Sequence, residues 1–368
     1  QNGVNPQTGQ PFSEALLLGI GGGLGAGYIL WEFSWAESAN IVLGFRNRWN
    51  YSVEFLKNLC GRLGAEVTIQ ETSGIKAAAA NLSAALERGV PFIAWVDKAH
   101  LPHQGLPEAL KGYGVHQVGV YGLANGSVEV DDLVERHFLV PVDIFAAGRA
   151  QIPSDKNRLA LVAPPANLDL SAAVRAGIED CIEHLSRDSE SFSLPVYKKW
   201  AKLMTDTKNK KGWPVVFKTR KGLFRTLCSV YEGIRLDNTE GCGLRGLYAD
   251  FLDEAAVILQ KPTVKEAADL YREAANAWVA VADAALPENP FREARVLLDE
   301  RYALYHVGNL AELAAVSARQ ERQVAELSQD FPLDAAQTQA LYEALQAAIT
   351  AVYDAEVRAL DALKAASV

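Results

Sequence analysis

Two side chains in the segment 112–132, GYGVHQVGVYGLANGSVEVDD, have the types that acid–base chemistry uses: His116 and Asp132. An imidazole can take a proton from a Ser or Cys nucleophile, and a carboxylate that fixes the imidazole is the orienting half of a nucleophilic triad. The pair can act in this way only if one element brings both groups together and a nucleophile lies beside them.

The same segment reads as a β-hairpin. Apolar residues alternate on both strands, at Val118, Val120, Val128 and Val130, around the turn signal Asn125-Gly126. A two-residue turn at Asn125-Gly126 predicts opposite faces for the two pairs of valines, whereas a three-residue loop, 124–126 with Gly126 left-handed, predicts one shared face. We favour the three-residue loop because it gives one buried face. His116 then shares this face with Asp132, its diagonal neighbour across the ladder.

Simpler interpretations of both residues exist. A histidine between valines in a strand is more often a satisfied core residue than a catalyst, and an aspartate just past a strand is usually a turn or cap residue. Two further histidines, His100 and His103, lie on a Pro-containing loop at a spacing that permits metal binding. The sequence indicates no third ligand beside them, so we interpret them as surface loop residues and expect no metal site.

Length, composition and charge limit the class of protein. At 368 residues, of which 49% are hydrophobic, the chain is long enough for two domains with cores of their own. A net charge of -9 argues against general nucleic-acid binding. No apolar run reaches membrane-spanning length without polar interruption, and no basic region followed by an apolar core opens the chain, so we expect a cytoplasmic protein without membrane contact.

The cysteines offer no obvious nucleophile. They are scattered, form no CxxC pair and have no histidine at metal-ligand spacing, so we interpret them as reduced structural thiols: Cys60, Cys181, Cys228 and Cys242. Cys242 precedes a helix and would be activated in principle, but nothing places a base beside it. The chain begins at Gln1 and its only methionine is Met204, so we expect further residues upstream of Gln1.

A glycine-rich stretch, SEALLLGIGGGLGAGY, occupies residues 13–28. Ser13 is placed to cap a short helix with Glu14 in its first turn, and the glycines after it permit tight turns. One interpretation is a loop that brings backbone N–H groups close to a substrate, and a purely structural turn is at least as well supported. Dinucleotide binding is a weaker interpretation because no strand precedes the glycines and no βαβ unit follows.

The chain divides into a mixed part and a helical part, which predicts an α+β fold. Before Pro164-Pro165 the patterns indicate strands and helices at 41–63, 66–70, 75–87, 90–96, 140–147 and 158–162. After it, apolar spacings of three and four predict helices at 172–185, 246–259, 264–285, 290–305, 310–327 and 335–363. We therefore predict domains at 1–165 and 166–368. The last helix is long and alanine-rich, which suits a bundle or packing against a second copy in a homo-oligomer.

A basic segment lies between Tyr197 and Arg225 of this otherwise acidic chain. Its basic residues are opposed by one acid, Asp206: Lys198, Lys199, Lys202, Lys208, Lys210, Lys211, Lys218, Arg220, Lys221 and Arg225. A solvated loop is the simpler interpretation, and a docking surface for an acidic partner is the alternative. Further along, the backbone amides that open the helix at 246 and the side chain of Arg245 are placed to meet an anion.

Several blocks, taken in order, resemble the butirosin-biosynthesis BtrH-like family: SEALLLGIGGGLGAGY, VDKAHLPHQGLP, GVHQVGVYG with VEVDD, GRAQIPSDKNRLALV and GCGLRGLYADFLDEAA. The resemblance implies a papain-like, cysteine-peptidase-type N-terminal domain with an antiparallel sheet, without its first helix here, and a helical domain after it. In the namesake, an acyl group moves from a carrier-protein thioester to an aminoglycoside amine. Carried over by position, His116 corresponds to the general base and Asp132 to the residue that orients it.

The family's nucleophilic cysteine lies on a helix upstream of the Ser-Glu block, so the resemblance places it before Gln1. The expected function is acyl transfer to an amine from a thioester, carried by an acyl carrier protein or another acidic partner, without a cofactor. The residues expected to bind substrate are Glu14, Gly22, Tyr28, Asp97 and Arg245. Two alternatives stay open: a non-catalytic scaffold of the same fold, and a cysteine peptidase or amidase with the same triad.

Overall fold

The computed structural model describes residues 9–33, 38–106, 108–133, 136–165, 168–236 and 242–366. They form two compact units, each assembled from separate stretches of the chain. The helical unit comprises Gln1–Gly64, Pro165–Leu298 and Glu321–Val368, and the sheet unit comprises Ala65–Pro164 and Asp299–Gln320. The predicted boundary at Pro164-Pro165 coincides with one changeover between units. The first stretch of the chain, however, groups with the helices instead of the sheet.

The helical unit contains most of the helices and one two-stranded sheet. Its complete elements are α1 (Glu14–Gly21), β1 (Leu24–Phe33), β2 (Ser38–Arg46), α2 (Ser52–Arg62), α5 (Leu170–Ser186), α6 (Pro195–Leu203), α7 (Trp213–Val216), α8 (Leu223–Arg235), α9 (Arg245–Ile258), α10 (Thr263–Ala285) and α13 (Ala335–Ala366). Two more helices, α11 (Glu288–Val307) and α12 (Leu310–Gln329), each contribute residues to both units. None of the helices in the described part of the chain combines the length and low polarity that a membrane crossing requires.

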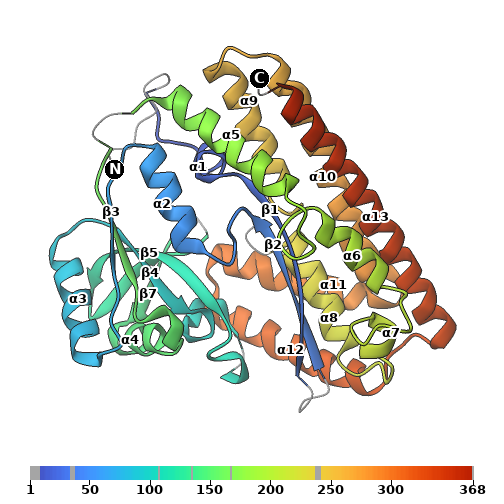
Figure 1. Ribbon diagram of the computed structural model, residues 1–368. Coiled ribbons are helices and arrows are strands. Elements are labelled where there is room, and N and C mark those ends of the chain that lie inside the picture. The colour runs from blue at the N-terminus through green and yellow to red at the C-terminus, as the bar shows by residue number, and fades with distance from the viewer. Residues whose placement is uncertain are drawn as a thin grey trace. The chain divides into compact units, whose positions relative to one another are not determined.

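The long helices α10 and α13 lie along each other in this unit (Figure 1). On α10 the side chains of Ala274, Trp278 and Val281 are fully buried, as the predicted apolar stripe requires. The facing stripe of α13 includes Leu345, Ile349 and Val352. Because both stripes keep helical spacing over many turns, the sequence sufficed to predict these two helices.

The start of the chain joins the helices because its own apolar side chains pack on them. Helix α1 is buried at almost every position and contacts α5 and α9, while β2 contacts α8. Ser13 caps α1 as predicted, since its Oγ accepts a hydrogen bond of 3.0 Å from the Leu16 backbone N–H. The predicted boundary at the proline pair would assign α1 to one domain and the helices that pack on it to another. The compact units differ from the predicted domains because α1 packs on these helices.

The sheet unit is built on a six-stranded sheet in the order β3-β8-β4-β5-β6-β7, and every strand pairing described within it is antiparallel. Its elements are β3 (Val67–Gln70), α3 (Ile75–Glu87), β4 (Phe92–Asp97), β5 (Val115–Ala124), β6 (Ser127–Asp131), β7 (His137–Pro141), α4 (Val142–Ala150) and β8 (Leu159–Val162). Between β4 and β5 the chain makes short 3-10 turns at Lys98–His100, Pro102–Gln104 and Glu108–Leu110. Figure 1 shows α3 and α4 beside these strands.

One face of this sheet carries the core of the unit. The buried valines of β5 and β6 pack in one cluster with Phe138 of β7, Leu82 of α3 and Phe145 of α4. Tyr305 and Leu313, from the second stretch of the unit, belong to the same cluster. A remote part of the sequence therefore completes the core on which the hairpin rests.

The sequence predictions for residues 140–147 and for the basic segment are wrong at least in part. The strand and turn expected at 140–147 are a strand only as far as Pro141, and α4 begins at the next residue instead of a turn. Proline cannot donate a ladder hydrogen bond, and its fixed φ suits the residue that precedes a helix. The simpler interpretation of the basic segment as a loop is also wrong in part, because α6, α7 and α8 form there on apolar residues such as Trp200, Trp213 and Phe224, all fully buried.

Candidate active site

The predicted hairpin forms, but by a different device from the one expected. Ala124 pairs with Ser127, so the turn has two residues, Asn125 and Gly126, both with positive φ. The three-residue loop is therefore wrong. A bulge between Val120 and Gly122 supplies the extra residue instead and returns the valines of both strands to one buried face. Asn125-Gly126 forms the two-residue turn that this dipeptide favours. The bulge then places the valines of both strands on the same face, so that all of them are buried.

His116 and Asp132 meet on the buried face of this hairpin. His116 lies on β5, and Asp132 is the first residue after β6. His116 Nε2 lies 2.6 Å from Asp132 Oδ1. The aspartate is 2% exposed and the histidine 8%, so the pair is almost fully withdrawn from water. A buried pair at this distance is a charge-assisted hydrogen bond, which is geometrically stricter than a surface contact.

The second carboxylate oxygen of Asp132 and its backbone carbonyl also have hydrogen-bond partners. Its Oδ2 lies 2.7 Å from His103 Nε2 and accepts a hydrogen bond of 2.7 Å from Gln104 Nε2. Its backbone carbonyl accepts a hydrogen bond from the Tyr305 hydroxyl. The carboxylate is thus the centre of a polar cluster within the sheet unit.

The electrostatics favour an ionised Asp132. Burial raises the pKa of the carboxyl, but the two imidazoles, His116 first, outweigh burial and bring the net pKa well below its usual range. An ionised carboxylate can only accept hydrogen bonds, so each of its imidazole partners must present an N–H. His116 therefore presents Nε2–H to this carboxylate, and Nδ1 is the ring nitrogen that takes no part in the contact.

His103 is the main residue of this site that the sequence analysis missed. It was interpreted as a surface loop residue, and this is wrong: it is 1% exposed and its ring stacks on Phe138, with centroids 4.0 Å apart and planes at 6°. The neighbouring residues carried a usable signal. Leu101 is buried, and Pro102 opens a 3-10 turn, so the residues that follow are directed back into the core.

Asp97 and His100 form a second histidine–carboxylate pair in the sheet unit. His100 Nδ1 lies 2.7 Å from Asp97 Oδ2, and the aspartate also accepts hydrogen bonds from the backbone N–H groups of Gly112 and Gly114. Asp97 is 0% exposed. These bonds fix both ends of the segment that carries His103, and a substrate-binding role for Asp97 stays a prediction. Within the described ranges, no three or more His, Cys, Asp or Glu side chains are arranged to hold a metal ion.

The other residues expected to bind substrate belong to the helical unit. Glu14 is exposed in the first turn of α1, and Tyr28 accepts a hydrogen bond of 2.9 Å from Trp213 Nε1 and stacks on Trp200. Arg245 is fully buried and paired with Glu356, also fully buried. Its guanidinium is thus occupied within the core, and its expected contact with an anion stays a prediction.

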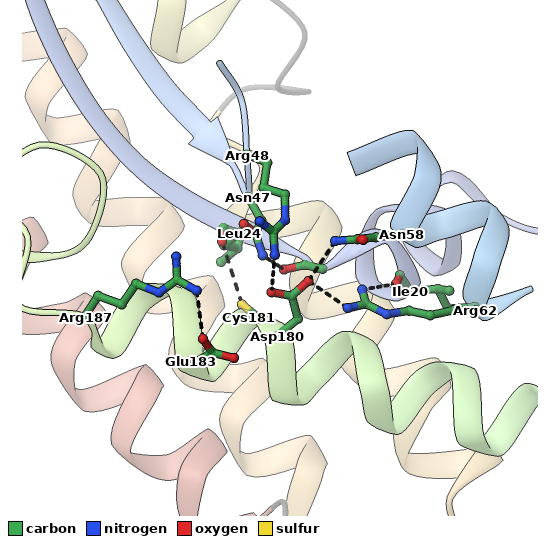
Figure 2. Close-up of polar contacts among 11 residues, drawn as sticks. Ile20, Leu24, Asn47, Arg48, Asn58, Arg62, Asp180, Cys181, Glu183 and Arg187 are labelled. Atoms are coloured by element: carbon green, nitrogen blue, oxygen red, sulfur yellow. Dashed lines mark hydrogen bonds and ion pairs between the residues drawn. The ribbon is translucent and has the colours of Figure 1, made fainter. Parts of the chain in front are cut away.

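Gly22, the last of these residues, lies beside Asp180 and Asn47. Figure 2 shows the side chains of Arg48, Asn58 and Arg62 directed toward Asp180. Asp180 accepts hydrogen bonds from Arg62 at 2.7 Å and from Arg48 and Asn58 at 3.4 Å, and Asn47 Nδ2 donates to the Gly22 carbonyl at 3.0 Å. Gly22 has φ 122°, and a Cβ there would lie 2.8 Å from both the Asp180 carboxylate and the Asn47 amide. This close packing favours the structural-turn interpretation of the glycine-rich stretch.

The cysteines of the chain lie outside the unit that carries His116 and Asp132. All four lie in stretches of the helical unit. Burial raises the pKa of Cys60 and of Cys181 to about 11, and it also raises the pKa of Cys228 and Cys242. A raised pKa disfavours the thiolate, which is the reactive form, so these thiols suit the structural role predicted for them.

Comparison with protein families gives two matches that follow each other along the chain. Residues 2–133 match the family model described as butirosin biosynthesis protein H, N-terminal. Residues 146–327 match a model described as a domain of unknown function (DUF4872). Comparison with curated proteins gives no match. The first match contains both His116 and Asp132. The two matches together cover most of the sequence. Together they support a BtrH-like family for this chain.

Proposed function

We propose that this protein transfers an acyl group from a thioester to an amine, with His116 as general base and Asp132 as the residue that orients it. The observation that carries the proposal is the 2.6 Å contact between His116 Nε2 and Asp132 Oδ1 on a buried hairpin face. The family match supports a role in biosynthesis, because butirosin biosynthesis protein H names the matched model.

The proposed reaction has two steps that share one imidazole. His116 Nδ1 takes the proton of a cysteine thiol, and the thiolate attacks the thioester carbonyl and expels the donor thiolate, which takes up the proton. The amine then attacks the acyl-cysteine, and the proton it loses passes to the departing cysteine sulfur through the same ring. Asp132 keeps the proton on Nε2 in both steps and stabilises the imidazolium.

The nucleophile in this proposal is a cysteine upstream of Gln1. The four thiols at positions 60, 181, 228 and 242 are not at the matching position, and their raised pKa values count against them. The lack of a suitable nucleophile among these four thiols favours one alternative, a scaffold protein in which the histidine–aspartate pair only stabilises the hairpin. A peptidase or amidase differs from the transferase by using water as the acceptor.

Labelling with an acyl thioester tests this function. The full-length protein, expressed from its gene, is incubated with a small acyl-N-acetylcysteamine thioester and analysed by intact mass and peptide mapping. We expect one acyl adduct on an upstream cysteine, which disappears when an aminoglycoside amine is added and an acylated amine is formed. Release of free acid alone would show hydrolysis, and the absence of any adduct at a cysteine would leave the scaffold as the function.

The basic segment supports an acidic carrier as the donor. Its single acid, Asp206, accepts hydrogen bonds from the backbone N–H groups of Lys208 and Asn209, and these bonds lower the pKa of its carboxyl. The lysine side chains of α6 and the following loop are exposed at 198, 199, 202, 208, 210 and 211. Two of them have carboxylate partners, Lys199 with Glu190 and Lys211 with Glu32.

Replacing Lys198, Lys202, Lys208 and Lys210 with Gln should weaken binding of an acyl carrier protein. We expect a loss of about tenfold at low salt that becomes smaller near 0.15 M salt, because exposed charges are screened over roughly 8 Å there. Titration calorimetry at two salt concentrations measures it. Lys76→Gln, an exposed lysine of α3, is the matched control. Unchanged affinity in the fourfold variant at low salt would remove the docking proposal and leave the acyl-transfer proposal standing.

A further inference from the structure

The carboxylate of Asp132 is not positioned by the sheet that leads to it. Strand β6 ends at Asp131, and Leu133 has a left-handed φ of 65°, so the chain turns away from the ladder directly after Asp132. Asp132 has no place in the described register of β6 with β5 or β7. The direction of its side chain must therefore be set by contacts of the side chain itself.

Those contacts divide the two carboxylate oxygens between different tasks. Oδ2 receives the His103 ring and the Gln104 amide, both at 2.7 Å, while Oδ1 receives only His116 among the described side chains. Two donors on one oxygen fix the rotation of the carboxylate about its χ2 bond, which is otherwise a soft torsion. Oδ1 then points at His116 Nε2.

The surroundings of His103 suit a fixed donor. The ring is 1% exposed, stacks on Phe138 and lies 6.2 Å from the Tyr305 ring, so it cannot turn without displacing core side chains. Its segment is tied down on both sides, because Leu101 is buried and Gln104 also reaches the Tyr305 hydroxyl, at 3.4 Å.

We infer that His103 is a positioning residue of the site: it donates Nε2–H to Asp132 Oδ2, which aims Oδ1 at His116 and thereby fixes the proton of His116 on Nε2. The consequence is that His116 Nδ1 is held ready as a base. This inference rests on the proposed function for its catalytic meaning, but the tautomer that it assigns to each ring does not.

Ring ¹⁵N spectra of the histidines test the assignment without any substrate. In the wild-type protein we expect both His103 and His116 as the Nε2–H tautomer, with Nδ1 unprotonated. His103→Phe keeps a ring stacked on Phe138 but removes the donor, and we expect the His116 signals to change to a mixture of tautomers. His103→Gln keeps an N–H donor, and we expect the single tautomer to be retained.

Phe138→Leu is the matched control for a purely structural role. It removes the stacking partner of His103 and leaves the donor in place, so we expect a loss of stability with the His116 tautomer unchanged. A wild-type His103 that carries its proton on Nδ1 would overturn the inference before any variant is made. So would a folded His103→Phe protein in which His116 stays wholly in the Nε2–H form.

Kinetics with the thioester probe then link the tautomer to catalysis. His103→Phe should lower kcat about 100-fold with little change in KM, since a misplaced base is costly although the substrate still binds. His103→Gln should stay close to wild type. If no protein acylates the probe but the tautomers change as expected, the proposed function fails and the positioning role stands. If the wild type is active and His103→Phe keeps both its kcat and its tautomer, the positioning role fails alone.

Discussion

His116→Ala is expected to lower the rate of acyl transfer by about 10³-fold, within the 10²–10⁴-fold range that a positioned general base contributes. The protein should stay folded, because removing the imidazole still leaves Asp132 with the donors of His103 and Gln104. Single-turnover acylation by the thioester probe measures the effect on the chemical step.

The chain offers a matched control for this variant. His137 also faces a carboxylate, with Nδ1 at 2.8 Å from Glu129 Oε1, but both side chains are more than a third exposed. His137→Ala should leave the acylation rate unchanged, because an exposed pair of this kind has little influence on its neighbours. Equal rates in wild type and His116→Ala would show that the imidazole at 116 is not the base.

The low pKa of Asp132 adds an expectation about pH. The carboxyl is ionised well below neutrality, so protonation of Asp132 cannot produce an acid limb of the rate profile above about pH 4, the ordinary pKa of an unfolded aspartate. Because folding lowers this pKa, the stabilising contribution of the group is present above that ordinary value. It is lost as the pH falls through the lowered, folded-state pKa. Asp132→Asn should remove this acid dependence from the unfolding curve.

Glu356→Leu is expected to cost about 3–5 kcal/mol of unfolding free energy, because it leaves the Arg245 guanidinium buried without its counter-ion. Both side chains are 0% exposed. Burial lowers the pKa of Arg245, but Glu356 outweighs burial and the net pKa is raised. Glu356 Oε1 also accepts a hydrogen bond of 2.8 Å from Trp278 Nε1, so the substitution affects α9, α10 and α13 together.

Two further variants identify the cause of this loss. Arg245→Met combined with Glu356→Leu removes both charges and should recover much of the stability, since a buried pair replaced by apolar groups is often neutral. Glu273→Leu breaks an exposed pair between the same two helices, α10 and α13, with Arg358 at 3.4 Å, and should cost about 0–1 kcal/mol. Urea unfolding measures all three. A loss below about 1 kcal/mol in Glu356→Leu would contradict the account of Arg245 as a buried charge.

Periodicity and caps predicted much of the fold. Helix α3 has the bounds 75–87 that its pattern indicates, and the Ser13 cap is present. The three helices α6–α8 were hidden because a high local density of lysine resembles a loop, although tryptophans at helical positions carry the packing. The local composition of such a segment reflects mainly the side chains that are exposed to water. Whether a short helix forms there depends on the few side chains that are buried.

The candidate site was predicted only in part, for reasons of distance and register. His116 and Asp132 lie on one hairpin, so local alternation sufficed to bring them to one face. The bulge that achieves this is set by burial of the whole sheet and has no signal in the turn sequence. His103 comes from the preceding turn, and Tyr305 from another stretch of the unit altogether. These contacts join residues that are far apart in the sequence, so they depend on tertiary packing. The alternation of apolar and polar residues within one segment carries no information about them.

The interrupted chain path of the sheet unit has a consequence for biosynthesis of the protein itself. Residues 65–164 leave the ribosome long before residues 299–320, which supply Tyr305 and Leu313. During this interval the nascent β-strands lack part of their hydrophobic cover, and the carbonyl of Asp132 lacks the tyrosine hydroxyl that later binds it. Maturation of the site is thus postponed until residues 299–320 have been translated, and a chain that stops before them has the hairpin without the Tyr305 and Leu313 side chains that complete its core.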